Sequence, residues 1–194
     1  RTRSGFSIGR GTTAPPSCTR VTAPRAIWER YHRDRRGWVH LDAELRPLVA
    51  AWDRARAAGA SVDGPPPEEH LLGGQALLVH REPLEALLSD GAEALARATA
   101  AFAERDHVLL VADQQGVVTY AAGGGGFAPD ARRLLLVEGA TWSEGARGTN
   151  AIGTALAEDR ATLVEGAAHY GLRFHGLVCF AAPIHGPDGR IVGV

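Results

Sequence analysis

Short apolar runs bounded by turn residues constrain the fold of this chain more than any other feature of its sequence. Four of them, at 107–113, 117–120, 161–166 and 176–185, are rich in Val, Leu, Ile and Thr and predict β-strands. The segment QQG between the first two predicts a hairpin. The segment GPDG at 186–189 predicts a turn that pairs the fourth run with the residues after it.

Helical patterns alternate with these strands. Apolar residues recur at three- and four-residue steps over 42–58 and over 84–104, which predicts two amphipathic helices. A third helix is expected after Thr149 or Asn150, since either residue can serve as its N-cap. This order of elements predicts an α+β fold in which an antiparallel sheet is flanked by helices, with an N-terminal helical extension.

Charge is distributed unevenly along the chain. Residues 1–60 hold 12 arginines and five acidic residues, whereas the rest is acidic and the whole chain has a net charge of -1. We predict a basic, poorly ordered arm over 1–40, a helical extension with a Pro-rich linker over 41–79, and a domain over 80–194.

Composition excludes several classes of protein. The near-neutral charge excludes a histone-like protein, and the absence of Lys excludes a Walker A ATPase site. Cys18 and Cys179 fit neither a disulfide scaffold nor a Cys-x-x-Cys zinc site. No apolar run long enough for a membrane span and no secretory signal are present, so we expect a cytoplasmic protein. The chain lacks Met and stops inside the strand-like run 191–194, which predicts a C-terminally truncated fragment.

Three motifs contain residues that a generic hydrophobic core would not require. They are TWSEGARGTNAIGTALAE at 141–158, AAHYG at 167–171 and VCFAAPIHGPDGRIVGV at 178–194. Together and in this order, they resemble the GAF sensor domain of the acetoin/glycerol-metabolism regulators, a family of sigma-54-dependent transcription activators of bacteria. The segment AWDRARAAGASVDGPP extends the resemblance upstream, to about residues 48–194. Phe180 and Gly186 depart from the family pattern.

The resemblance implies a sensory domain of a bacterial transcriptional regulator, controlling a downstream ATPase, a helix-turn-helix or both. It implies a small-molecule effector, such as a diol, a ketone or a related metabolite, and a homodimer. Contacts with DNA and sigma-54 RNA polymerase would be made only by domains outside this chain, and neither a cofactor nor a membrane is implied.

In a GAF-like domain the ligand lies between the sheet and the helices and loops that cover one of its faces. An apolar site with few polar groups suits a small effector. Period-two alternation puts Cys179 and Ala181 on one face of their strand and Phe180 on the other. The expected ligand-binding residues are Trp142, Asn150, Thr154, His169, Cys179 and Ala181.

Each of these residues also has a purely structural interpretation. Trp142 is typical of a core, Asn150 of an N-cap, and Cys179 of a small buried apolar side chain. A metal site built from His169, His175 and Cys179 would lack zinc-like spacing and carboxylate ligands, so we predict no metal site and no catalytic residue.

Two other functions stay open from the sequence. One is a thiol-dependent GAF enzyme with Cys179 as nucleophile and His169 or His175 as base. The other is a structural dimerisation domain in which helices 42–58 and 84–104 pair between chains.

Overall fold

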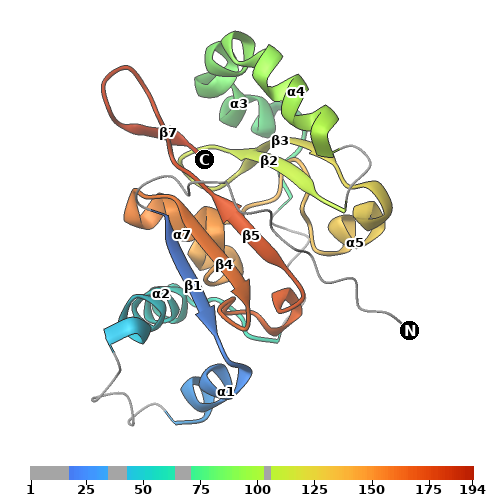
Figure 1. The fold of residues 1–194 in the computed structure, drawn as a ribbon. Coiled ribbons are helices and arrows are strands. Elements are labelled where there is room, and N and C mark those ends of the chain that lie inside the picture. Colours follow the sequence, from blue (N-terminus) through green and yellow to red (C-terminus); the bar gives the residue numbers. More distant parts are fainter. Residues whose placement is uncertain (1–17, 35–42, 64–70, 103–105) are drawn as a thin grey trace, which may run out of the picture.

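The structure is a computed structural model that describes residues 18–34, 43–63, 71–102 and 106–194. Within these residues the strands form a three-stranded sheet, β1–β4–β5, and two two-stranded sheets, β2–β3 and β6–β7 (Figure 1). The strands are β1 (Thr19–Ala23), β2 (Val108–Ala112), β3 (Val118–Gly123), β4 (Thr162–Gly166), β5 (Val178–Ala181), β6 (Ile184–His185) and β7 (Ile191–Gly193).

Helices surround these sheets, and the α+β class predicted from the sequence is confirmed. The α-helices are α1 (Arg25–Arg33), α2 (Arg46–Ala57), α3 (Gly74–Asp90), α4 (Ala92–Phe102), α5 (Ala128–Arg133), α6 (Glu144–Arg147) and α7 (Ala151–Glu158). The 3₁₀ helices are η1 (Ala43–Leu45), η3 (Gly125–Phe127) and η4 (Leu172–Phe174). Among the described residues, no helix combines the length and apolar character that a membrane crossing requires.

One hydrophobic cluster joins the N-terminal elements to the second half of the chain. Trp28 of α1 and Trp52 of α2 are buried in it together with Val164 of β4. The indole Nε1 of Trp52 donates to the Ala168 carbonyl at 2.8 Å, and that of Trp28 donates to the Tyr170 carbonyl at 2.9 Å. Figure 1 shows α1 and α2 at one end of the molecule and α3 and α4 at the other.

The predicted poorly ordered arm over 1–40 is wrong for residues 18–34, which form β1 and α1. Residues 1–17 and 35–42 lie outside the described residues. Strand β1 pairs in parallel with β4, with Val21 opposite Val164. The β1–β4–β5 sheet is therefore mixed rather than antiparallel.

The hydrophobic core also crosses the domain boundary expected at residue 80, because α2 packs in the same cluster as α7. The Pro-rich linker is not described.

A second cluster lies under the β2–β3 hairpin, which forms where the sequence predicts it. The single helix expected over 84–104 is instead two helices: α3 begins ten residues earlier and ends at Asp90, where Gly91 caps it. Glycine interrupts a helix because its backbone is conformationally free. Likewise, the strand expected over 176–185 is divided into β5 and β6 around Pro183, which has no N–H to donate to a sheet.

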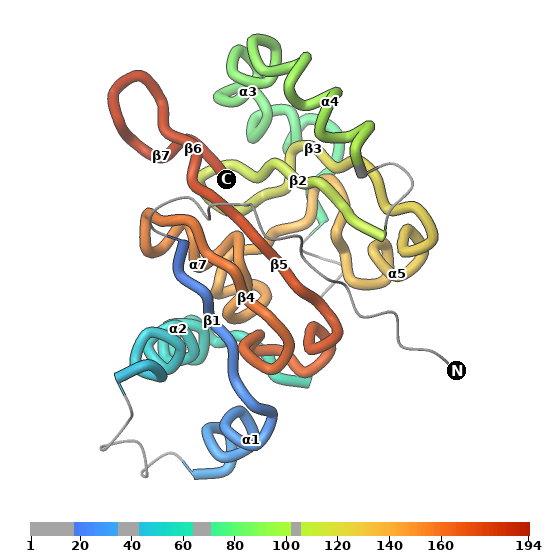
Figure 2. The backbone as a smooth tube through the Cα atoms, in the orientation of Figure 1, coloured from blue at the N-terminus to red at the C-terminus, as the bar shows by residue number. Residues whose placement is uncertain are grey.

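Strand β7 links the smaller sheets. It pairs antiparallel with β6, and the backbones of Val194 and Ala112 exchange two hydrogen bonds at the end of β2. Figure 2 shows the C-terminus beside one end of β2, where these two hydrogen bonds lie. Strands β2 and β5 are both edge strands of their sheets, because β5 pairs with β4 and β2 with β3.

Candidate ligand-binding site

A cavity of about 780 Å³ opens between β2 and β5, a volume typical of small-molecule sites. Its lining is mostly apolar and comes from β2, the 3₁₀ turn η3, α7, β5 and the residues between them. The sequence did not single out Val108, Leu110, Phe127, Leu136 and Ile152, which line it. These residues belong to ordinary apolar runs, so no local signal distinguishes them from core residues.

Trp142 and Asn150 line this cavity, but their polar groups are already bonded within the protein. The Trp142 Nε1 donates to the Leu135 carbonyl at 2.8 Å. The Asn150 amide nitrogen donates to the carbonyls of Trp142, at 3.0 Å, and Gly148, at 2.8 Å, while its oxygen accepts from the Gly153 N–H at 3.0 Å. Asn150 is thus the N-cap of α7, as one of its two interpretations predicted.

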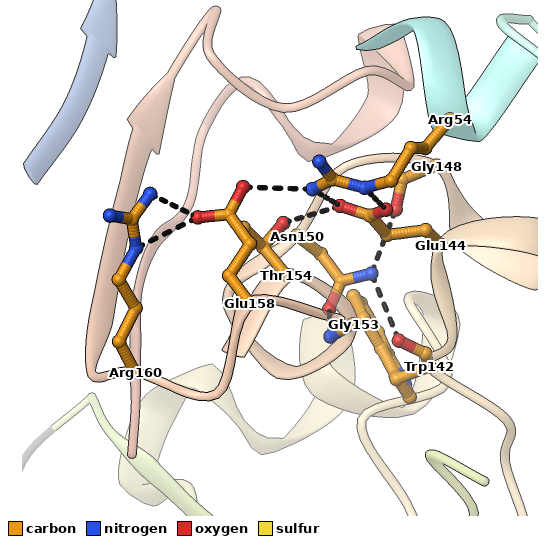
Figure 3. Close-up of polar contacts among 9 residues, drawn as sticks. All are labelled: Arg54, Trp142, Glu144, Gly148, Asn150, Gly153, Thr154, Glu158 and Arg160. Atoms are coloured by element: carbon orange, nitrogen blue, oxygen red, sulfur yellow. Dashed lines mark hydrogen bonds and ion pairs between the residues drawn. The ribbon is translucent and has the colours of Figure 1, made fainter. Parts of the chain in front are cut away.

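Thr154 does not line the cavity and instead belongs to a charged network on the other side of α7 (Figure 3). Its hydroxyl donates to Glu144 Oε1 at 2.8 Å. The same carboxylate accepts two hydrogen bonds from the Arg54 guanidinium, at 2.7 and 2.9 Å. Arg54 also donates to Glu158 at 3.0 Å, and Arg160 pairs with the second oxygen of Glu158.

The network explains much of the WSE…GTN…GT motif. Glu144 joins α6 to α2 through Arg54 and to α7 through Thr154. A Cβ at Gly153 would lie 2.6 Å from the Glu144 nitrogen, and Gly148 has a φ of +74° beside the Tyr170 ring. The sequence alone does not indicate the pairing of Glu144 with Arg54, because the two residues lie far apart in the chain.

His169 is fully buried and lies behind the cavity wall rather than in it. Its Nδ1 donates to the Gly166 carbonyl at 3.0 Å, so Nε2 is left to accept from the Cys179 thiol, 3.4 Å away. Burial lowers the pKa of His169 to about 4, and burial raises the pKa of Cys179 to about 12. Both groups are therefore neutral at pH 7.

The structure brings four of the six predicted residues to the cavity: Trp142, Asn150, Cys179 and Ala181. The expected alternation along β5 is present, because Ala181 is buried whereas Val178 and Phe180 are exposed. In the part of the chain that the structure describes, no three His, Cys, Asp or Glu side chains are grouped to hold a metal ion.

Residues 81–194 match the family model described as MimR, N-terminal domain. The chain is 33% identical over 174 residues to the acetoin dehydrogenase operon transcriptional activator AcoR of Bacillus subtilis, covering 86% of this chain and 27% of AcoR. It is 38% identical over 85 residues to the acetoin catabolism regulatory protein of Cupriavidus necator, covering 44% of this chain and 13% of that protein. The chain therefore spans well under half of the length of these relatives.

The fold is similar to that of a chain in the crystal structure of the E. coli DhaR(N)–DhaL complex, with a TM-score of 0.67. The match covers 76% of this chain and 50% of that chain, at 21% sequence identity. At this identity the likeness concerns the fold alone.

Proposed function

Because this chain belongs to the family described as MimR N-terminal domains, we propose that it is the small-molecule-sensing domain of a cytoplasmic bacterial transcriptional regulator. The relatives named above are an activator and a regulator. Output through an ATPase, a helix-turn-helix, DNA and sigma-54 RNA polymerase would belong to parts of the regulator outside this chain. The proposed sensor acts by binding its effector more tightly in one of two conformations.

The observation that carries this proposal is the apolar cavity between β2 and β5. The polar groups of Trp142 and Asn150 that could meet a ligand are bonded to backbone atoms, and the Cys179 thiol donates to His169. A hydroxyl placed against Trp142, Asn150 and Cys179 would gain no hydrogen bond from these side chains, because their polar groups are already bonded. The mostly apolar lining supports an uncharged effector, such as a ketone or a diol.

Calorimetric titration and thermal shift with 2-butanone, acetoin and 2,3-butanediol test the proposal; two of the relatives are named for acetoin. We expect saturable binding that Ala181→Leu weakens about tenfold, because the added carbons enter the cavity and overpacking costs about 1–3 kcal/mol. Thr154→Val is the matched control. Thr154 is as deeply buried but does not line the cavity, so this variant should lose about 1 kcal/mol of stability and keep its affinity.

Two results would count against the proposal. If no probe shifts the melting temperature of the folded wild-type protein, a sensor for this class of metabolite is not supported. If Thr154→Val weakens binding as much as Ala181→Leu, the ligand does not occupy the cavity.

The thiol-dependent enzyme has less support from the geometry. Nucleophilic cysteines are activated as thiolates by a lowered pKa, whereas the Cys179 pKa is raised and its neighbour His169 is neutral. Rapid alkylation of Cys179 by iodoacetamide at pH 7 would revive this alternative.

The alternative of a structural dimerisation domain, in which helices 42–58 and 84–104 pair between chains, also has less support. The apolar face of α2 is buried in its own chain through Leu48, Val49 and Trp52. The proposal of a homodimer rests instead on α3, where Leu78 and Val79 are 51% and 60% exposed.

A further inference from the structure

The cavity between β2 and β5 is much larger than a four-carbon effector needs. Its volume is about 780 Å³. If each heavy atom of a ligand takes about the 30 Å³ that a water molecule takes in the liquid, 2-butanone would fill about a fifth of it. Wall atoms around a void lose their contacts, so a ligand that leaves most of an apolar cavity empty binds weakly. The volume therefore favours a larger effector.

One end of the cavity is closed and apolar. There the backbones of Val194 and Ala112 exchange two hydrogen bonds, and Gly193 pairs with Ile184, so β7 joins the end of β2 to β6. Two residues that line this end, Ala181 and Val194, are 6% and 8% exposed. A ligand atom at this end would meet mainly apolar side chains and would be shielded from water.

The opposite end of the cavity is polar and reaches the solvent. Strand β2 begins there, and Asp106 and His107, which precede it and line the cavity, are both exposed. Apart from the Cys179 thiol, these two are the ionisable side chains of the lining. The lining thus changes from polar at Asp106 to apolar at Ala181, a distribution that suits a ligand with one polar end.

Between the two ends, the lining suits an alkyl chain. Leu110 of β2 and Ile152 of α7 contribute aliphatic side chains, and Trp142 contributes an indole whose nitrogen is already bonded to the Leu135 carbonyl. Strand β2 is five residues long, about 16 Å, and an extended chain of eight to ten carbons is slightly shorter than that. Each CH₂ group buried there would raise the affinity about fourfold.

We propose that the effector of this cavity is an uncharged aliphatic molecule of about eight to ten carbons with one polar end, such as a medium-chain ketone. Its alkyl chain extends toward Ala181, and its polar group stays at the open end near Asp106 and His107, where water can reach it. This inference rests on the proposed sensor function and narrows the class of its effector.

Calorimetric titration and thermal shift of this chain with 2-butanone, 2-hexanone, 2-octanone and 2-decanone test the proposal. We expect one molecule to bind per chain. The affinity should rise about fourfold with each added carbon and level off between 2-octanone and 2-decanone, once the alkyl chain reaches the closed end.

Two variants of the lining should shift this series in opposite directions. In Ala181→Leu the added carbons occupy the closed end, so the affinity should level off about three carbons earlier, and 2-octanone should lose more affinity than 2-butanone. Leu110→Ala enlarges the cavity and should move the levelling-off to longer chains, which keeps the test valid if Ala181→Leu fails to fold.

The matched control is Leu88→Ala. Leu88 is half-buried like Leu110 but lines a separate hollow between α3 and β3, so this variant should give the wild-type series.

Three outcomes would overturn the proposal. If 2-butanone binds and 2-octanone binds no more tightly, the medium-chain effector is wrong while the proposed sensor stands. If Leu88→Ala changes the series and neither lining variant does, the alkyl chain occupies the hollow beside α3. If none of the four ketones binds the folded protein, the proposed sensor fails together with this inference.

Discussion

His169 and Cys179 form a neutral hydrogen-bonded pair behind the cavity wall. The bond from His169 Nδ1 to the Gly166 carbonyl selects the tautomer, and the thiol then donates to Nε2. Burial disfavours the charged form of either group. This pair therefore links folding stability to pH rather than supplying a nucleophile.

The pH dependence of stability should reveal this link. The unfolded chain takes up a proton on His169 near pH 6.5, whereas the folded chain resists it down to about pH 4. The stabilisation is thus complete above pH 6.5 and is lost as the pH falls toward 4. We expect the free energy of unfolding to fall by about 2 kcal/mol between pH 7 and pH 5 because of His169, as measured by urea denaturation.

The control for this prediction is His169→Gln. That variant should be less stable at pH 7 and should lose less stability on acidification than the wild type. Equal losses in the two proteins would contradict a buried, neutral His169.

The sequence predicted the role of Asn150 but not the roles of Glu144 and Thr154. The N-cap role of Asn150 depends on its own sequence neighbourhood, so it was visible in the sequence. The roles of Glu144 and Thr154 depend on Arg54, which lies on α2, and no spacing within the motif indicates that partner. In this motif, the polar residues Glu144 and Thr154 join structural elements rather than line the cavity.

At the scale of elements, α6 and α7 pack closely against each other next to the candidate site. The Ser143 side chain caps α6, Asn150 caps α7, and Gly153 lies against the backbone of Glu144. The two helices therefore meet with no room for a side chain at Gly153.

Gly153→Ala should destabilise the protein despite the preference of helices for alanine. Alanine gains about 1 kcal/mol over glycine within a helix, but the new Cβ would lie 2.6 Å from the Glu144 nitrogen, and backbone must move. We expect a net loss of unfolding free energy by chemical denaturation. Gly176→Ala, where nothing lies within 4 Å of the added Cβ, should be close to neutral, and equal stability of the two variants would refute the close contact.

Elements with local signals were predicted well, and elements that depend on distant partners were not. The hairpin β2–β3 and the helix α2 follow from nearby apolar patterns and were found where expected. Strand β1 holds a single large apolar residue, Val21, and depends on pairing with β4, where Arg20 also reaches Glu165 at 2.9 Å. A sequence window around 19–23 contains none of that information.

At the scale of the whole molecule, two hydrophobic clusters meet at the cavity. One cluster unites α1 and α2 with α7 and β4, and the other lies under the β2–β3 hairpin. Ile152 of α7 packs against both and also lines the cavity. A ligand there would touch both halves of the domain at once, which is the arrangement that a sensor needs.

Assembly of the whole molecule should depend on α3. A second hollow of about 660 Å³, lined by Leu78 and Val79, lies between α3 and β3 and also contains Arg81 and Glu82. Because Leu78 and Val79 are exposed beside this hollow, we expect a two-fold dimer that buries them through this face. Sedimentation should show a dimer that Leu78→Glu/Val79→Glu makes monomeric. Val178→Glu, on exposed β5, should not change it, and a dimer unaffected by the α3 variant would place the interface elsewhere.

The two edge strands that flank the cavity have a further consequence. Both strands line the cavity, and the outer edge of each pairs with no further strand of its own sheet. An extended segment that entered between them antiparallel to β2, as β7 does at Ala112, would find partners on both sides and would fuse the sheets into one. A peptide in that position would be a strand of the sheet and would also form a wall of the cavity. The shape of the binding site would therefore depend on whether that strand is in place.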